Sequence, residues 1–225
     1  MNTVSNKNAG VLHKKLKTLL NRNLSELCAI KGNLLGVTKD KEIKAILITS
    51  SKPTEGKTVS AISMAYGLTE SGAKVLLIDG NLRSPYIHYL FNVDCAPGLT
   101  DLITSDAKYY EALRKTEWES LYVMPSGKNI YYSIEVFKHE TFKAKLDFLK
   151  QMFDYIIFDG HSILISSDVP LVAKYFDGTI IVVECEKTKW EVLQQAKEKI
   201  NNVGGNVLGV VLNKRSYYIP KIFYR

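Results

Sequence analysis

Hydrophobic residues follow two different patterns along this chain. Short apolar runs, rich in β-branched residues, occupy positions 45–49, 75–79, 121–124, 155–159, 179–183 and 207–212. Between most of these runs lie segments with the length and periodicity of helices, such as 57–71 and 188–203. Regular alternation of buried strands with helices predicts an α/β domain, with a mostly parallel sheet flanked by helices on both faces.

The first forty residues have a different character. Leucine and isoleucine recur there at spacings of three and four residues over positions 11–35, which predicts an amphipathic helix in two pieces. We therefore divide the chain into a basic, amphipathic helical extension over 1–40 and a main domain over 41–225. A chain of 225 residues is long enough to bury one sizeable core.

Charge is concentrated at the two ends of the chain. Residues 1–44 carry nine Lys or Arg against three acids, residues 213–225 carry four against none, and the remainder has 17 against 20. The basic ends are either solvated tails or surfaces that attract an anionic partner such as the cytoplasmic leaflet of a membrane. They lack a recognisable nucleic-acid-binding motif, so we do not expect a nucleic acid partner.

Two observations bear on the cellular location. Apolar stretches in the sequence fall short of the roughly 18 residues that a membrane span requires, and the N-terminus does not resemble a secretion signal. Cys28, Cys95 and Cys185 are widely separated and lack metal-ligand spacing, so we expect reduced and mostly buried thiols. Both observations predict a cytoplasmic protein.

The turn after the first strand has the form of a phosphate-binding loop. It reads SKPTEGKT over residues 51–58, with Ser51 in place of the usual first glycine. In such a loop, backbone N–H groups and a helix N-terminus face the phosphates, Lys57 adds a positive charge, and Thr58 offers an oxygen to Mg²⁺. The alternative is an ordinary turn that ends in Gly-Lys-Thr, but the flanking strand and helix favour the loop. The predicted ATP-binding residues here are Ser51, Lys52, Thr54, Glu55, Gly56, Lys57, Thr58 and Val59.

Two acidic residues end later strands. Asp79 ends the run VLLID, and Asp159 ends YIIFD. Ligands of open α/β sheets collect at the carboxyl ends of the strands, and an aspartate in this position commonly serves nucleotide-bound Mg²⁺. Either residue alone could be a turn former. Together with Thr58 they predict a site for Mg²⁺ beside the nucleotide.

Several segments together resemble one known family. SSKPTEGKT, VLLIDGNLRSP, FDYIIFDG, FDGTIIVVECEKTKWEVL and GGNVLGVVLNKRSYYIP follow, in order and spacing, the pattern of the bacterial tyrosine kinases of capsule and exopolysaccharide synthesis. That family belongs to the MinD/ParA-like P-loop ATPases. The resemblance spans residues 24–225 and implies a P-loop NTPase fold and ATP-dependent kinase activity. It also implies a membrane-anchored polysaccharide co-polymerase, or chain-length activator, as partner, and assembly into a homo-oligomer.

The same resemblance assigns roles to individual residues. It implies that Lys57, Asp79, Arg83 and Asp159 are catalytic, and that Arg83 holds the active-site loop or the substrate. It also implies that Asn213 approaches the adenine.

The sequence departs from the family pattern near the second strand. Asn81 stands where the family has a second acid, and an amide cannot take a proton from tyrosine at neutral pH. After Asp159 the family commonly reads Thr-Pro-Pro, whereas this chain has His161, either as an acid or base or as a loop residue that fills space. In the segment that helps such kinases form rings, Ala29 replaces an arginine.

The tyrosine residues raise a further question. The family carries a flexible tyrosine-rich tail, but this chain ends RSYYIPKIFYR, whose tyrosines are either phosphate acceptors or parts of a docked apolar tail. We expect Tyr109 and Tyr110 to be structural aromatic residues.

Three functional hypotheses follow. The first is a cytoplasmic protein-tyrosine autokinase, recruited to the inner face of the membrane by its partner. The second is a catalytically impaired, nucleotide-gated module of the same polysaccharide machinery, which Asn81 and the short tail favour. The third is a MinD/ParA-like positioning ATPase, which rests on Lys52 and the basic ends, because such ATPases place a signature lysine at that position.

Overall fold

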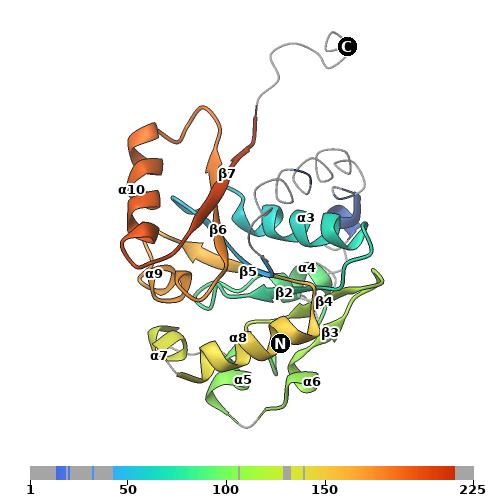
Figure 1. Ribbon diagram of the computed structural model, residues 1–225. Coiled ribbons are helices and arrows are strands. Elements are labelled where there is room, and N and C mark those ends of the chain that lie inside the picture. Colours follow the sequence, from blue (N-terminus) through green and yellow to red (C-terminus); the bar gives the residue numbers. More distant parts are fainter. Residues whose placement is uncertain are drawn as a thin grey trace, which may run out of the picture.

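We analysed a computed structural model of the chain, which describes residues 14–18, 20, 32, 43–105, 107–128, 133–138 and 140–215. Its centre is a seven-stranded sheet in the order β3-β4-β2-β5-β1-β6-β7. All neighbouring strands are parallel except β3 and β4 (Figure 1). The strands are β1 (Ala45–Ser50), β2 (Val75–Asp79), β3 (Arg114–Lys115), β4 (Leu121–Met124), β5 (Tyr155–Ser162), β6 (Gly178–Glu184) and β7 (Val207–Asn213).

Helices cover both faces of the sheet, as the sequence predicts. On one face α3 (Lys57–Thr69) and α4 (Ile87–Phe91) bury their apolar side chains against the strands. The opposite face is covered by α5 (Leu99–Thr104), α6 (Tyr109–Ala112), α7 (Ser133–Lys138), α8 (Glu140–Met152), α9 (Asp168–Ala173) and α10 (Trp190–Asn201). Because both faces are covered, β1 and β2 are buried along their whole length. This arrangement is the α/β, mostly parallel fold that the hydrophobic pattern predicts.

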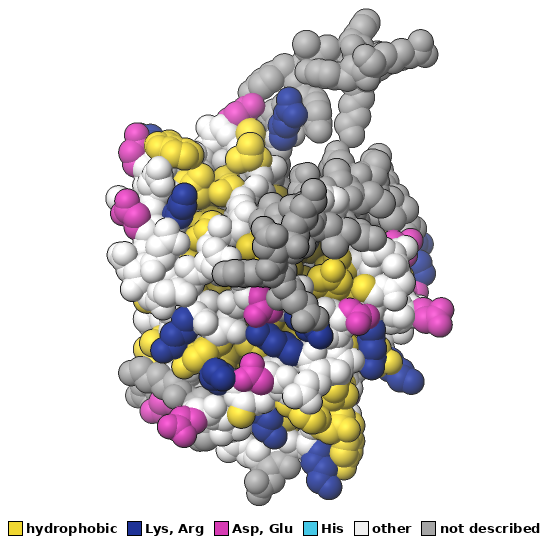
Figure 2. All heavy atoms as spheres, viewed as in Figure 1, with side chains coloured by type: hydrophobic (Ala, Val, Ile, Leu, Met, Phe, Trp, Pro, Cys, Tyr) yellow, Lys and Arg dark blue, Asp and Glu magenta, His cyan; other side chains and the backbone are white. Residues whose placement is uncertain are grey.

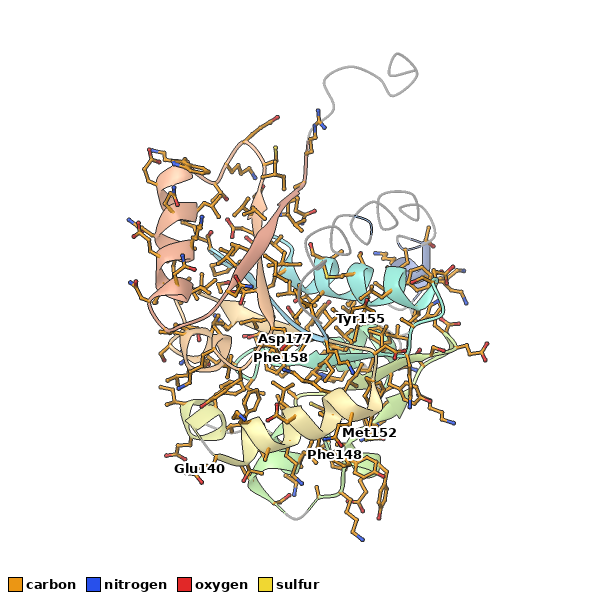
Figure 3. The ribbon with its side chains drawn as sticks, viewed as in Figure 1. Glu140, Phe148, Met152, Tyr155, Phe158 and Asp177 are labelled. Atoms are coloured by element: carbon orange, nitrogen blue, oxygen red, sulfur yellow. The ribbon has the colours of Figure 1, made fainter. Side chains whose placement is uncertain are left out.

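The fold packs the two faces with different kinds of side chain. Phe137, Phe142, Phe158 and Phe176 form a cluster of rings between the sheet and α8, with centroids 5.0–6.4 Å apart. In Figure 3, Phe158 lies on the sheet side of α8, whereas Phe148 lies on the opposite side of the same helix. The α3 face is instead mostly aliphatic.

The N-terminal extension contacts the core through two leucines. Leu16 and Leu20 are buried and belong to the apolar cluster under α3. Residues 14–18, 20 and 32 are helical, in agreement with the periodicity of this segment. The rest of the predicted helix lies outside the described residues, so the division of the chain at residue 40 stays a prediction.

Three expectations differ from the structure. Strand β3 was not predicted, because two charged residues carry no apolar signal. Cys95 and Cys185 are free but half-buried rather than buried, since Cys95 lies in the loop between α4 and α5 and Cys185 directly follows β6. Tyr109 and Tyr110 are exposed on a short helix, with 37% and 58% of their surface accessible, so they are not part of the core.

The structure also bears on membrane association. Among the described residues, no helix is both long and apolar enough to cross a membrane.

Candidate functional site

The loop between β1 and α3 has the backbone of a phosphate cradle. Thr54 and Gly56 both adopt positive φ angles, of 66° and 96°. A Cβ atom at Gly56 would lie 1.9 Å from Nδ2 of Asn213, so this position accepts only glycine. Helix α3 begins at Lys57, directly after the loop, and its N-terminal N–H groups are oriented toward the loop.

A buried carboxylate holds the loop from within. Glu55 is 3% exposed, and its carboxylate accepts a hydrogen bond from the backbone N–H of Lys52 at 2.7 Å. The hydroxyl of Thr188, in the loop after β6, donates to the other oxygen. Glu55 therefore has an internal role in fixing the loop, and its carboxylate is already occupied by these partners.

Two residues at the end of β7 donate hydrogen bonds to backbone carbonyls of the loop. The Asn213 amide donates to the carbonyl oxygen of Glu55 at 2.9 Å. The Lys214 ammonium group donates to the carbonyl of Thr54 at 2.6 Å and pairs with Glu184 at 3.1 Å. The predicted nucleotide residue Asn213 thus lies directly against the phosphate loop. Its approach to an adenine stays a prediction.

Asp79 is fully buried at the carboxyl end of β2. One of its oxygens accepts hydrogen bonds from the backbone N–H groups of Tyr86 and Ile87, both at 3.0 Å. The backbone N–H of Asn81 approaches the other oxygen at 3.3 Å. Burial and the nearby Asp159 carboxylate raise the pKa of Asp79 to about 7, despite these three donors.

Asp159 lies beside Asp79, in register on the neighbouring strand β5. Burial raises its pKa to about 6, while the charge of Lys57 and a hydrogen bond from the Thr58 hydroxyl act in the opposite direction. Its Oδ1 atom is buried and has no hydrogen-bond partner among the described residues. The sheet therefore brings Lys57, Thr58, Asp79 and Asp159 into one site.

Arg83 and His161 flank this site. Arg83 pairs with the buried Asp168 at 3.3 Å, and about half of its side chain is exposed. The His161 ring accepts a hydrogen bond from the backbone N–H of Ser162 at 2.8 Å through Nδ1. Burial, together with the nearby charges of Lys57 and Arg83, lowers the pKa of His161, so the ring is neutral at pH 7.

Asn81 is nearly buried next to Asp79. Its amide nitrogen donates to the carbonyl of Ser84 at 3.0 Å, which holds the turn that carries Arg83. Its amide oxygen is buried without a partner among the described residues. The residue thus has a structural role in the turn and leaves one acceptor atom unused.

The remaining predicted residues occupy different parts of the loop. Ser51 is buried, and its hydroxyl has no partner among the described residues. Lys52 and Thr54 are exposed, and Val59 turns outward from α3 with 40% of its surface accessible. Thr188 and Lys214 were missed by the sequence analysis, because no local pattern connects them with a loop more than 130 positions away.

The chemistry of the donor atoms suits a hydrated divalent cation. Mg²⁺ prefers oxygen ligands and usually takes one or two carboxylates together with phosphate oxygens. Two buried carboxylates side by side, one with an unused oxygen, lie next to the Thr58 hydroxyl. A cation there would offset the burial that raises the pKa of both aspartates and the repulsion from Asp159 that adds to the rise for Asp79. The residues therefore fit Mg²⁺.

The protein has a P-loop NTPase fold, as its strand order, its phosphate loop and the helix after this loop show. Comparisons with known proteins refine this class. Residues 43–209 match the AAA domain family model. Tyrosine-protein kinase CpsD of Streptococcus agalactiae serotype Ia is 32% identical over 78% of this chain and 76% of that protein.

Solved structures agree with this comparison. The crystal structure of the chimerical protein CapA2B2 superposes with a TM-score of 0.81 at 29% identity, covering 86% of this chain and 85% of that one. The septum site-determining protein MinD of Pyrococcus horikoshii, complexed with Mg-ADP, has a TM-score of 0.66 at 25% identity, covering 77% and 72%. The chain belongs to the bacterial tyrosine-protein kinase family of capsule synthesis, within the P-loop ATPases that also include MinD.

Proposed function

We propose that the protein is an ATP-dependent protein-tyrosine kinase that regulates capsule or exopolysaccharide synthesis. The observation that carries this proposal is the pair of buried carboxylates, Asp79 and Asp159, placed in register beside Lys57 and Thr58 at the end of a phosphate loop. Family membership supplies tyrosine as the acceptor, because the relatives are named tyrosine-protein kinases.

Each residue of the site has a distinct part in this proposal. The loop N–H groups and Lys57 bind the phosphates of ATP, while Thr58, Asp79 and Asp159 hold Mg²⁺. When bound, Mg²⁺ neutralises charge on the β- and γ-phosphates. Arg83, which Asp168 holds in place, orients the active-site loop or the substrate tyrosine.

The chemical step is a direct transfer. The phenolic oxygen of a tyrosine attacks the γ-phosphorus, the bond to the bridging oxygen of ADP breaks, and ADP leaves. The phenolic proton passes to a carboxylate of the site or to water. Because such transfer depends mainly on positioning and charge neutralisation, Asn81 removes at most the contribution of one general base, about 10² to 10⁴-fold.

The basic ends support a membrane-linked partner. The chain carries a net charge of +7, most of it outside the central domain, and Lys14, Lys15 and Lys17 are exposed. We propose that a membrane-anchored polysaccharide co-polymerase recruits this cytoplasmic protein to the inner face of the membrane. Electrostatic attraction of this kind weakens as salt is added.

One experiment separates the proposed kinase from the other two functions. The purified protein is incubated with Mg·ATP, with and without the cytoplasmic tail of a co-encoded membrane protein, and both phosphate release and phosphotyrosine are measured. Phosphotyrosine that increases with the tail supports the kinase. Phosphate release without phosphotyrosine, in both conditions, would favour the nucleotide-gated module, and ATP-dependent dimerisation without phosphotyrosine would favour the positioning ATPase.

A further inference from the structure

A pocket lies away from the phosphate loop, between α5, α6 and α8. Its volume is about 600 Å³, within the range of pockets that hold small organic ligands. None of the residues that line it belongs to the candidate nucleotide site. The lining residues that the argument uses are Lys108, Tyr109, Tyr110 and Lys145.

The pocket is positively charged. Lys108 and Lys145 line it, and the other lining residues that the structure describes are apolar, aromatic or hydroxyl-bearing, without a carboxylate. In the described part of the chain, neither ammonium group forms an ion pair. Two described acids are close by in sequence: Glu111 accepts from the Lys108 backbone N–H at 2.8 Å and Asp147 pairs with Lys143 at 3.0 Å, while Asp106 lies outside the described residues. The two lysine charges therefore remain available to a ligand.

Aromatic rings form one wall of the pocket and continue onto the surface. Tyr109 contacts Tyr110 and Phe148, with ring centroids 5.7 and 5.3 Å apart. The Lys108 ammonium group lies 5.8 Å from the centroid of the Tyr110 ring. At the lower right of Figure 2, where Figure 1 places α6, hydrophobic side chains form a patch with basic side chains beside it.

Two hydroxyl groups of the pocket are already engaged. Thr104 donates to the carbonyl of Thr100, and Ser105 donates to the carbonyl of Asp101. Both bonds lie within the last turn of α5, so these hydroxyls serve the helix end. The groups that we consider for ligand recognition are the two ammonium groups and the tyrosine rings.

We propose that this pocket binds a phosphorylated ligand that carries a flat ring. Ammonium groups suit phosphate oxygens, and exposed tyrosine rings stack on flat rings. Two sources supply this chemistry. One is phosphotyrosine, the product of the proposed kinase, and the other is a nucleotide. The proposal does not depend on catalysis, because no residue of the phosphate loop takes part.

Calorimetric titration tests the proposal in the full-length Lys57→Ala protein, in which the nucleotide site is weakened. The probes are O-phosphotyrosine and uridine monophosphate, each compared with tyrosine, uridine and inorganic phosphate. We expect at least one phosphorylated ring to bind more tightly than its ring or phosphate alone. The tighter of the two probes identifies the source.

Point variants locate the binding site. Lys108→Gln and Lys145→Gln should each weaken binding about fivefold, as expected for a solvent-exposed charge pair. Tyr110→Leu should also weaken binding, whereas Tyr110→Phe should keep it, because the ring and not the hydroxyl makes the contact. Lys143→Gln is the matched control, since this lysine lies on α8 outside the pocket.

Two results would overturn the proposal. In the first, both phosphorylated probes bind no better than inorganic phosphate. In the second, the phosphorylated probes bind, but Lys108→Gln and Lys145→Gln leave the affinity unchanged. These two variants must also unfold at the same temperature as Lys143→Gln, so that all three are equally well folded. Both results leave the kinase proposal intact, because phosphotyrosine formation by the wild type is measured separately.

Discussion

Replacing Asp79 by asparagine should stabilise the metal-free protein while it abolishes kinase activity. Burial and Asp159 raise the pKa of Asp79 from its ordinary 3.8 to about 7, so the folded protein holds this proton more tightly than the unfolded chain. An acid whose pKa is higher in the folded than in the unfolded protein lowers the free energy of unfolding as the pH rises from the unfolded pKa to the folded one. The loss in the free energy of unfolding that Asp79 causes grows from near zero at pH 4 to about 4 kcal/mol at pH 8, at 1.36 kcal/mol per pKa unit.

Asp79→Asn also removes one hydrogen bond, which lowers the free energy of unfolding. An asparagine oxygen can accept from Tyr86 and Ile87, as the carboxylate does, but the weaker contact with the Asn81 N–H is lost. One such hydrogen bond contributes about 1 kcal/mol. Asp79→Asn should therefore be near neutral at pH 5 and raise the free energy of unfolding by about 3 kcal/mol at pH 8.

Urea unfolding in EDTA at pH 5 and pH 8 measures this difference. Asp177→Asn is the control with the opposite sign, because hydrogen bonds from the Ala45 and Lys44 N–H groups and from Lys150 lower the pKa of Asp177. It should destabilise the protein at pH 8. If Asp79→Asn does not raise the free energy of unfolding at pH 8, or raises it equally at both pH values, ionisation of the buried Asp79 does not lower the stability of the protein.

Three further predictions concern the same site. Lys57→Ala should weaken ATP binding by more than about threefold and lower the free energy of unfolding only slightly, because the core is untouched and the main loss to the folded protein is the attraction between Lys57 and Asp159. Calorimetry measures the first effect and urea unfolding the second. Asp159→Asn should abolish phosphate transfer but weaken nucleotide binding less than Lys57→Ala, which a comparison of kcat with Kd will show. Asn81→Asp should raise phosphotyrosine formation by at most about 10² to 10⁴-fold, the contribution of one general base. It should also lower the stability of the metal-free protein, because it buries a third carboxylate and loses the amide donor to the Ser84 carbonyl.

Much of the fold was predictable because its signals are local. Each long strand contains a run of apolar residues, and Lys57 and Asp79 fall at a helix start and a strand end, as expected. Asp159 was expected to end its strand, but β5 continues to Ser162; the register of β5 with β2 still places Asp159 beside Asp79. Strand β3 could not be predicted, because its two charged residues pair with β4 only through the backbone.

The contacts that hold the phosphate loop were also beyond the sequence. Thr188 and Lys214 are polar residues in loops, and their reach to Glu55 and Thr54 depends on how β6 and β7 pack beside β1. The exposure of Tyr110 on the short helix α6 has a similar origin. Such features depend on tertiary packing, which a pattern of apolar residues does not encode.

The central claim is that this site transfers phosphate from ATP to tyrosine. The most direct measurement is the amount of phosphotyrosine per chain, mapped by mass spectrometry, after incubation with Mg·ATP and the cytoplasmic tail of the membrane partner. We expect phosphotyrosine in the wild-type protein and its loss in Lys57→Ala, with Tyr217, Tyr218 and Tyr224, which lie outside the described residues, as the first candidates. A wild-type protein that binds and hydrolyses ATP under these conditions without forming phosphotyrosine would contradict it.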